Sequence, residues 1–197
     1  MADGTARRRP GRRPGLTDTR GEIIAAASKV FADKGFDKAT IRGIAREAGV
    51  DPALVHHYFS TKEGIFVAAL RLPADPSTAL PLILQGPREQ IGERLVRFIL
   101  TLTANAEARE PVLALVRSAA TNEQAVLMVR EFLTRAILDR VVEMLGVSRL
   151  RMEVAFAQMF GVIMLRYVLR VEPLASVEIE ELVELLAPTI QRYLGEE

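Results

Sequence analysis

This 197-residue sequence predicts an all-α protein made of a three-helix module near its N-terminus and a larger helical body. Apolar residues recur at spacings of three and four along most of the chain, which indicates helices, and no segment shows the alternation of a convincing strand. The charge is also unevenly divided. The first 62 residues hold 12 Lys and Arg against 7 Asp and Glu, whereas the rest hold 14 against 18. A basic segment joined to an acidic body favours binding of a polyanion by the first part, although a solvated charged surface is the alternative.

The composition suits a soluble globular protein, with 49% hydrophobic and 26% charged residues. The chain has no cysteine, which excludes disulfide frameworks, Cys-ligated zinc fingers and thiol nucleophiles. The N-terminus is polar and Arg-rich and lacks the apolar stretch of a secretory signal. We therefore expect a cytoplasmic protein.

Residues 1–16 are predicted to form a flexible basic arm, because proline and glycine interrupt a run of arginines that cannot build a core. Two roles remain open for these arginines. They insert into the narrow minor groove of A·T-rich DNA, or they contact phosphates nonspecifically from a disordered tail. The arginines concerned are Arg7, Arg8, Arg9, Arg12 and Arg13.

Cap residues predict where the first helices begin and end. Thr17 or Asp18 caps a first helix that ends at residues 34–35, and Thr40 and Gly49 bound a short second helix. The third helix starts after the cap Asp51, with Pro52 in the first helical position, where its missing N–H costs nothing.

A fourth helix is predicted to start at a capping box formed by Ser60 and Glu63. Pro73 ends it, and the proline- and glycine-rich stretch up to Arg88 predicts a long loop or irregular turns. Pro188 is expected to kink the last helix. The five body helices are predicted at about residues 88–104, 110–120, 122–145, 148–171 and 177–194.

The second and third helices, joined by a glycine-containing turn behind a supporting helix, form a helix-turn-helix arrangement. From Thr40 the sequence reads TIRGIAREAGVDPALVHHYFSTKEGIF. This run resembles the DNA-binding signature of TetR-family regulators, in which T-x-x-x-I-A-x-x-A-G-V leads to a Tyr-Phe pair, a Lys and a fourth helix. The resemblance extends from about Thr17 to Leu70. It implies a DNA-binding domain at residues 17–62 and an effector-binding and dimerisation domain at residues 63–197.

The resemblance implies that several residues contact the DNA backbone. The hydroxyl of Thr40 adjoins a helix N-terminus, which favours a phosphate. Arg42, Tyr58 and Lys62 are long donors beside the recognition helix, suited to contacts that set the register without reading sequence. His57 is either a core-filling or surface-polar residue, or a further phosphate contact.

Base contacts are expected from the exposed start of the third helix, at Pro52, Ala53, Leu54 and His56. The chain departs here from the commoner family pattern, because the first three side chains are apolar. They cannot form bidentate bonds to base edges, although they can contact thymine methyl groups. We therefore expect His56, Arg42, DNA shape and the basic arm to carry more of the specificity.

The run VAFAQMFGVIML, from Val154 to Leu165, is apolar around the whole helix except at Gln158, so it should be buried on more than one side. It is shorter than the ~20 residues that a bilayer requires, which argues against a membrane span. We expect one face to pack on the body and another on a twin subunit, with Gly161 allowing close approach. Together with the last helix it would form the four-helix homodimer interface that the resemblance also implies.

The resemblance further implies a small-molecule effector pocket in the body. Arg117 and Asn122 are candidate polar anchors, and ordinary core packing is the alternative for each apolar residue. The apolar candidates are Phe98, Leu102, Leu113, Val116, Met128, Phe132, Phe160, Met164 and Tyr167.

The function predicted is a ligand-responsive repressor that binds a palindromic DNA operator as a dimer. The sequence leaves two alternatives. An all-helical enzyme is disfavoured, since no nucleotide-binding glycine pattern, Ser/His/Asp set or metal cluster is present. His56 and His57, the only histidines, diverge by about 100° on a helix and cannot readily share one metal, so no metal or cofactor is predicted. A protein-binding adaptor that has lost DNA recognition is the second alternative, suggested by the apolar Pro52–Leu54 surface.

Overall fold

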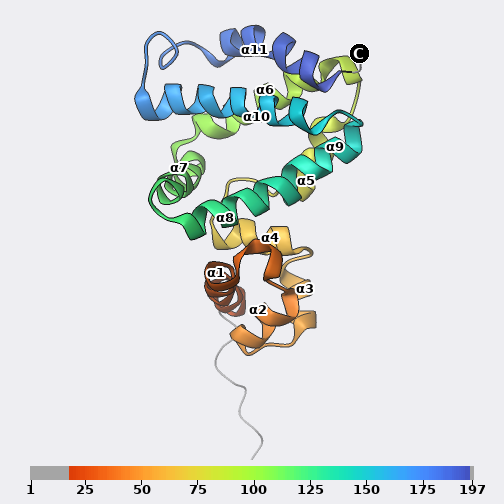
Figure 1. Ribbon diagram of the computed structural model, residues 1–197, viewed down its shortest axis with the longest axis vertical. Coiled ribbons are helices and arrows are strands. Elements are labelled where there is room, and N and C mark those ends of the chain that lie inside the picture. The colour runs from red at the N-terminus through yellow and green to blue at the C-terminus, as the bar shows by residue number, and fades with distance from the viewer. Residues whose placement is uncertain (1–17, 196–197) are drawn as a thin grey trace, which may run out of the picture.

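The protein is described by a computed structural model over residues 18–195, and every regular element in this range is a helix. Figure 1 shows a small helical module at one end of the molecule and a larger set of helices stacked above it. The predicted all-α fold is therefore confirmed. The basic arm at residues 1–16 lies outside the described residues.

The N-terminal module begins with α1 (Thr19–Lys38), followed by α2 (Ile41–Ala48) and α3 (Pro52–Tyr58). Asp18 caps α1, because its carboxylate accepts a hydrogen bond from the Gly21 backbone N–H at 3.1 Å. The regular helix breaks at Gly35, where φ is 77° and ψ is 174°. The positive φ explains why glycine occupies this position, at the predicted end of the helix.

The fourth helix, α4 (Lys62–Ala69), is capped by Thr61 and not by Ser60 as predicted. The Thr61 hydroxyl accepts a hydrogen bond from the Gly64 backbone N–H at 3.0 Å. Both residues are good capping residues, and this hydrogen bond shows that the chain uses Thr61.

The prediction of a loop or irregular turns up to Arg88 was wrong, because α5 (Pro76–Leu84) occupies most of that stretch. Asp75 caps this helix by accepting from the Ser77 backbone N–H at 2.8 Å, and Pro76 stands in the first turn, where proline is well tolerated. Pro81 costs one interior hydrogen bond, which burial of Leu80 and Ile83 offsets.

The remaining body helices follow the predicted order. One of them starts earlier than expected, at Ala106 in place of residue 110, because Asn105 caps it and Pro111 falls within its first turns. The last helix continues through Pro188. The elements are η1 (Arg88–Gln90), α6 (Ile91–Ala104), α7 (Ala106–Thr121), α8 (Glu123–Phe132), η2 (Leu133–Leu138), α9 (Asp139–Leu145), α10 (Arg149–Ile163), η3 (Met164–Leu169) and α11 (Ile179–Leu194).

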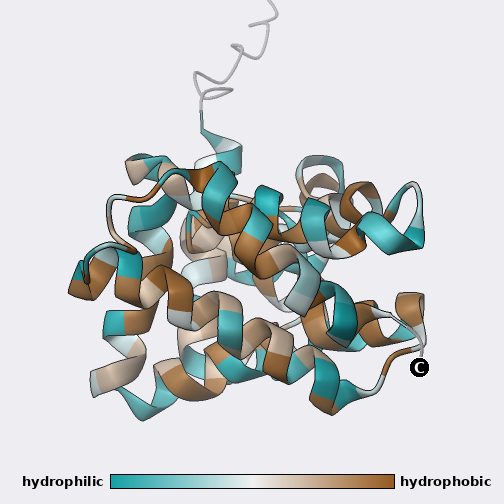
Figure 2. Ribbon diagram, turned by 90° about the horizontal axis from the view of Figure 1, so that it is seen from above, coloured by the Kyte–Doolittle hydropathy of each residue, from teal (hydrophilic) through white to brown (hydrophobic). Residues whose placement is uncertain are grey.

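Two apolar cores hold the described residues together. The first lies in the N-terminal module and includes Phe31, Phe36 and Phe66, together with Phe132 from α8 of the body. The second lies between α6, α9, α10 and α11. Figure 2 shows apolar positions distributed over the stacked helices of the body, as expected for layers that bury one face against the next. Phe132 thus connects the module to the body.

The closest helix contact in the body joins α6 to α11. The Gly92 backbone N–H donates a 2.7 Å hydrogen bond to Oε1 of Gln191, whose Nε2 donates to the Arg88 carbonyl at 2.9 Å. At the rim of this contact, hydrogen bonding from the exposed Arg97 guanidinium lowers the pKa of Glu180. This arrangement fixes α11 along the length of α6.

Gly92→Ala is expected to destabilise the body by about 1–3 kcal/mol, as overpacked cores do. A Cβ at this position would meet the Gln191 backbone nitrogen at 2.6 Å and the Ala187 carbonyl oxygen at 2.7 Å, so the two backbones would have to separate. Chemical denaturation measures the loss. Gly161→Ala is the matched control, because its Cβ would meet no atom of the chain within 4 Å. Equal stability of the two variants would contradict the close packing.

Candidate DNA-binding site

Three caps hold the helix-turn-helix in shape, and each is the predicted residue. Thr40 Oγ1 accepts from the Gly43 backbone N–H at 3.0 Å and so starts α2. Gly49 ends α2 in the left-handed region, with φ 68° and ψ 28°. Asp51 Oδ1 accepts from the Ala53 backbone N–H at 2.7 Å and starts α3. These caps define the turn between the two helices.

The angle between α2 and α3 is set by a small buried core. Ile44 and Ala45 of α2 are fully or almost fully buried, and so are Val55 and Phe59 of the third helix and its end. These side chains pack on α1 and α4 within the first core. The opposite face of α3 is consequently left to solvent, as recognition requires.

Most of the predicted DNA contacts lie exposed on this module. Leu54 is half-buried, whereas the remaining base-reading candidates are exposed. His57 is also exposed, with its ring centroid 5.4 Å from that of Tyr58, so the core-filling interpretation of His57 is wrong. The exposed candidates are Thr40, Arg42, Pro52, Ala53, His56, His57 and Tyr58.

Lys62 differs from the other predicted contacts because its ammonium has partners within the chain. Its Nζ donates to the carbonyl oxygens of Phe36 at 2.9 Å and Asp37 at 3.4 Å, and it lies 4.4 Å from the centroid of the Phe36 ring. A cation is favoured at the C-terminal end of a helix, where unpaired carbonyls gather. Lys62 therefore ties the start of α4 to the end of α1.

Lys62→Met is expected to lower the free energy of unfolding by roughly 1.5–3 kcal/mol, the range for hydrogen bonds to charged groups. DNA binding should weaken alike for all sequences, because α1 would no longer hold α4 firmly. Denaturation and binding titrations at several salt concentrations measure the two effects. If the slope of log affinity against log salt concentration falls by about 1, Lys62 also contacts a phosphate. If the free energy of unfolding is unchanged, Lys62 does not hold α4 to the end of α1.

The module is joined to the body by contacts that the sequence did not indicate. Oε2 of Glu131 on α8 accepts a 2.9 Å hydrogen bond from the Asp37 backbone N–H. The ring of Phe132 stacks on Phe66 at 4.5 Å and meets Phe36 edge-on at 5.6 Å. Arg140 lies 3.6 Å from Glu63 of α4. No local motif marks these residues, because their partners are distant in sequence.

The structure brings together only part of the predicted effector pocket. Phe98 and Leu102 line an open, largely apolar cavity of about 640 Å³ between α5, α6 and the start of α7. Phe132, in contrast, belongs to the core of the N-terminal module, and Met128 packs against it. Arg117 is exposed and pairs with Glu110, and Asn122 caps α8. Neither polar candidate lines this cavity.

The other pocket candidates are distributed over two helices. Leu113 is buried and Val116 half-buried on α7. Phe160 is 37% exposed, and Met164 is half-buried. The half-buried Tyr167 ring is covered by the Arg109 guanidinium at 4.1 Å.

The helical segment from α10 to η3 exposes a large apolar surface. Among the described residues it is the one helix long and apolar enough to cross a membrane, by length and composition only. Met152, Ala155 and Met159 are buried against the body, so one face of α10 is already packed. The exposed large apolar residues of this segment are Leu150, Val154, Phe156, Phe160, Leu165, Val168 and Leu169.

No group of three or more His, Asp or Glu side chains that could hold a metal occurs within residues 18–195. The exposed site in this module is instead a capped helix, α3, with basic and hydroxyl side chains around it. These features define a helix-turn-helix DNA-binding protein. Residues 23–69 match the family described as bacterial regulatory proteins, tetR family, and residues 89–194 match the tetracyclin repressor-like C-terminal domain. The chain therefore belongs to the TetR family of transcription regulators, which are not enzymes.

Individual relatives agree with this assignment over parts of the chain. The HTH-type transcriptional regulator BetI of Rhizobium meliloti is 47% identical over 49 residues, which are 25% of this chain and 24% of BetI. The BetI protein of Brucella anthropi is 34% identical over 100 residues, covering 48% of this chain and 50% of that protein. The chain thus spans half or less of the length of these curated relatives.

Two solved structures are similar to this chain. A TetR-family regulator from Streptomyces coelicolor is 34% identical, with 95% of this chain and 100% of that one covered and a TM-score of 0.46. The fatty acid degradation regulator FadR from Bacillus halodurans is 19% identical, with 87% and 97% covered and a TM-score of 0.50. The second likeness shows a shared fold.

Proposed function

We propose that this regulator is a ligand-responsive repressor that binds a palindromic operator as a homodimer in the cytoplasm. The observation that carries the proposal is the capped, outward-facing α3 beside α2, with its hydroxyl, basic and aromatic side chains on one exposed surface. Residues 17–62 would be the DNA-binding domain, and residues 63–197 the effector-binding and dimerisation domain. The basic arm at residues 1–16 would add contacts to the DNA backbone or the minor groove.

The dimer would form through α10, η3 and α11. Phe156 and Phe160 stack on each other at 6.2 Å on the outer face of α10, and each is 37% exposed. Leu185 of α11 is 67% exposed. Exposed large apolar side chains of this kind indicate an interface, and two helices from each of two chains would cover them. Two recognition helices could then enter successive major grooves.

On DNA, Thr40, Arg42 and Tyr58 would contact the sugar-phosphate strands and Pro52, Ala53 and Leu54 the thymine methyl groups. His56 would supply the polar base contact, since it is exposed on the same helix. His57 and Lys62 would act at the backbone.

His56→Ala is expected to change the preference among operator variants, whereas Tyr58→Ala should weaken binding to all of them alike. Loss of a base contact costs about 1–3 kcal/mol at the affected position, while a phosphate contact carries no sequence information. Titrations against a set of single-base operator variants separate the two patterns. A uniform loss for His56→Ala would contradict its assignment as a base contact.

An effector would bind in the body and favour a dimer with the wrong spacing of recognition helices. The cavity lined by Phe98 and Leu102 supports this proposal, since its volume of about 640 Å³ lies in the range of small-molecule sites. A coupling of about 2 kcal/mol is enough for a tens-fold change in operator affinity. Glu131 and Phe132 supply the contacts through which α8 would transmit the change to α1.

The proposal is tested by titrating the full chain with DNA from upstream of its own gene at two salt concentrations. Sequence-dependent binding that weakens with salt is expected of the regulator. An intact dimer that binds no DNA at low salt would instead favour the protein-binding adaptor, to which the apolar Pro52–Leu54 surface is suited.

A further inference from the structure

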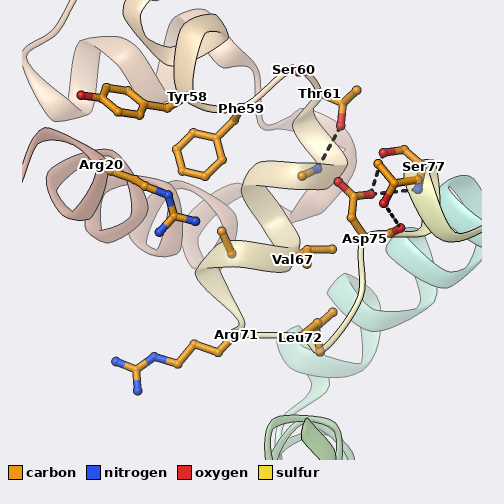
Figure 3. Close-up of a pocket in the computed structure, with 13 residues that line it drawn as sticks. Arg20, Tyr58, Phe59, Ser60, Thr61, Val67, Arg71, Leu72, Asp75 and Ser77 are labelled. Atoms are coloured by element: carbon orange, nitrogen blue, oxygen red, sulfur yellow. Dashed lines mark hydrogen bonds between the residues drawn. The ribbon is translucent and has the colours of Figure 1, made fainter. Parts of the chain in front are cut away.

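A second cavity lies between the N-terminal module and the start of α5, away from the cavity lined by Phe98 and Leu102. It is framed by α1, the end of α3, the α4 helix and the segment that leads into α5 (Figure 3). Its volume is about 490 Å³, which is ample for a small molecule. The residues that decide its chemistry are Arg20, Tyr58, Phe59, Val67, Arg71 and Leu72.

Two guanidinium groups give the cavity its positive charge. Arg20 reaches from α1 over the face of the Phe59 ring, with its Cζ 5.2 Å from the ring centroid, as Figure 3 shows. Arg71 follows α4 at a positive φ of 54°. Within residues 18–195 neither guanidinium forms an ion pair. The Arg20 guanidinium is therefore available to an anion at the cavity, whereas the Arg71 side chain extends away from the other labelled residues in Figure 3.

The one carboxylate that lines the cavity is already engaged. Asp75 Oδ1 accepts hydrogen bonds from the Ser77 backbone N–H at 2.8 Å and from the Ser77 hydroxyl at 2.7 Å. Figure 3 places Asp75 beside Thr61 and Ser77, whereas Arg20 lies next to Phe59. The acidic and basic groups are thus on different sides of the cavity, and an anion would be drawn to the side of Arg20.

The rest of the wall is divided between apolar side chains and the hydroxyl-bearing residues Ser60, Thr61, Ser77 and Thr78. Phe59 and Val67 are buried core residues with atoms at the cavity, and Leu72 is half-buried beside them. The apolar part of this wall favours an apolar ligand body. A ligand that satisfies both kinds of wall has an anionic head and an apolar body.

We propose that this cavity binds a small amphipathic carboxylate, whose head pairs with Arg20 and whose body contacts Phe59, Val67 and Leu72. Tyr58 lines the same cavity at the end of the recognition helix. The bound ligand competes with the DNA backbone for the cationic and hydroxyl donors at this point, so it lowers DNA affinity directly. This site is separate from the effector pocket proposed for the body, and its test does not depend on that pocket.

The experiment titrates the full chain, without DNA, with octanoate, benzoate and inorganic phosphate, and follows binding by calorimetry. We expect the two carboxylates to bind more tightly than phosphate, because phosphate lacks an apolar body. Arg20→Ala should weaken carboxylate binding about 10-fold or more, the loss expected when a charged hydrogen bond is removed. Ala68→Phe should abolish it, since Ala68 lines the cavity and a larger side chain fills the space. Arg130→Ala, which removes an exposed arginine of α8, is the matched control and should bind normally.

Circular dichroism checks that each variant is folded, and Arg20→Ala decides the result if Ala68→Phe fails to fold, because Arg20 is exposed. Equal carboxylate binding by Arg20→Ala, Ala68→Phe and the wild type would overturn the proposal and place the ligand elsewhere, as in the body. Absence of carboxylate binding by the wild type, or tighter binding of phosphate than of octanoate, would also overturn it.

Discussion

Phe160→Arg is expected to split the dimer and to lower operator affinity on the order of 100-fold or more. A dimer binds the operator with two linked DNA-binding modules, and a monomer loses the affinity that this linkage adds. Phe160 stacks on Phe156 on the outer face of α10, where a charged side chain would have to be buried without a partner in the dimer. The isolated chain should stay folded, since this face does not contribute to its own core.

Sedimentation and DNA titration of the same samples measure the two effects together. Leu127→Arg is the matched control, because Leu127 is an apolar residue of α8 that is 46% exposed outside the proposed interface. It should remain dimeric. If the Phe160→Arg protein remains dimeric and the Leu127→Arg protein is monomeric, the interface lies on α8 and the proposed interface is wrong.

The N-terminal module could be predicted almost completely because its structure is encoded locally. Thr40, Gly49 and Asp51 act within four residues of the backbone groups that they cap, so their identity and spacing are enough. The exception is the choice of Thr61 over Ser60, where two adjacent capping residues compete. Local patterns fix a helix to within a residue or two of its end.

The helix that the sequence did not predict, α5, shows the limit of local patterns. Pro73 before the helix and Pro76 and Pro81 within it were interpreted as helix breakers. Leu80 and Ile83 nevertheless bury their side chains in the body and stabilise the helix through tertiary contacts. The burial of an apolar face depends on partners that are distant in sequence.

The same reasoning explains the outcome at Phe132, which was predicted to line the effector pocket. Periodicity places Phe132 on the inner face of its helix, but it cannot say which core that face meets. In the structure its ring packs on Phe36 and Phe66 of the N-terminal module. The amphipathic pattern therefore predicted that Phe132 is buried, but not that it packs against the N-terminal module.

That role predicts a large effect for Phe132→Ala, which is expected to destabilise the protein by about 3–5 kcal/mol, as truncation of a buried phenylalanine does. The loss falls on the contact between the module and α8, because the ring is 5% exposed and meets two aromatic side chains of the module. We therefore expect the N-terminal module to melt before the body, so that a single unfolding transition becomes two.

Differential scanning calorimetry and hydrogen exchange measure this separation, with Leu127→Ala as the matched control, since Leu127 lies on the same helix and is 46% exposed. Once the contact is lost, an effector bound in the body should no longer change operator affinity, because α8 can bias α1 only through groups that touch it. Glu131 would remain as the other link, with its hydrogen bond to the Asp37 backbone. A Phe132→Ala protein that unfolds in one transition and keeps its full response would show that Glu131, and not the aromatic contact, couples the two parts.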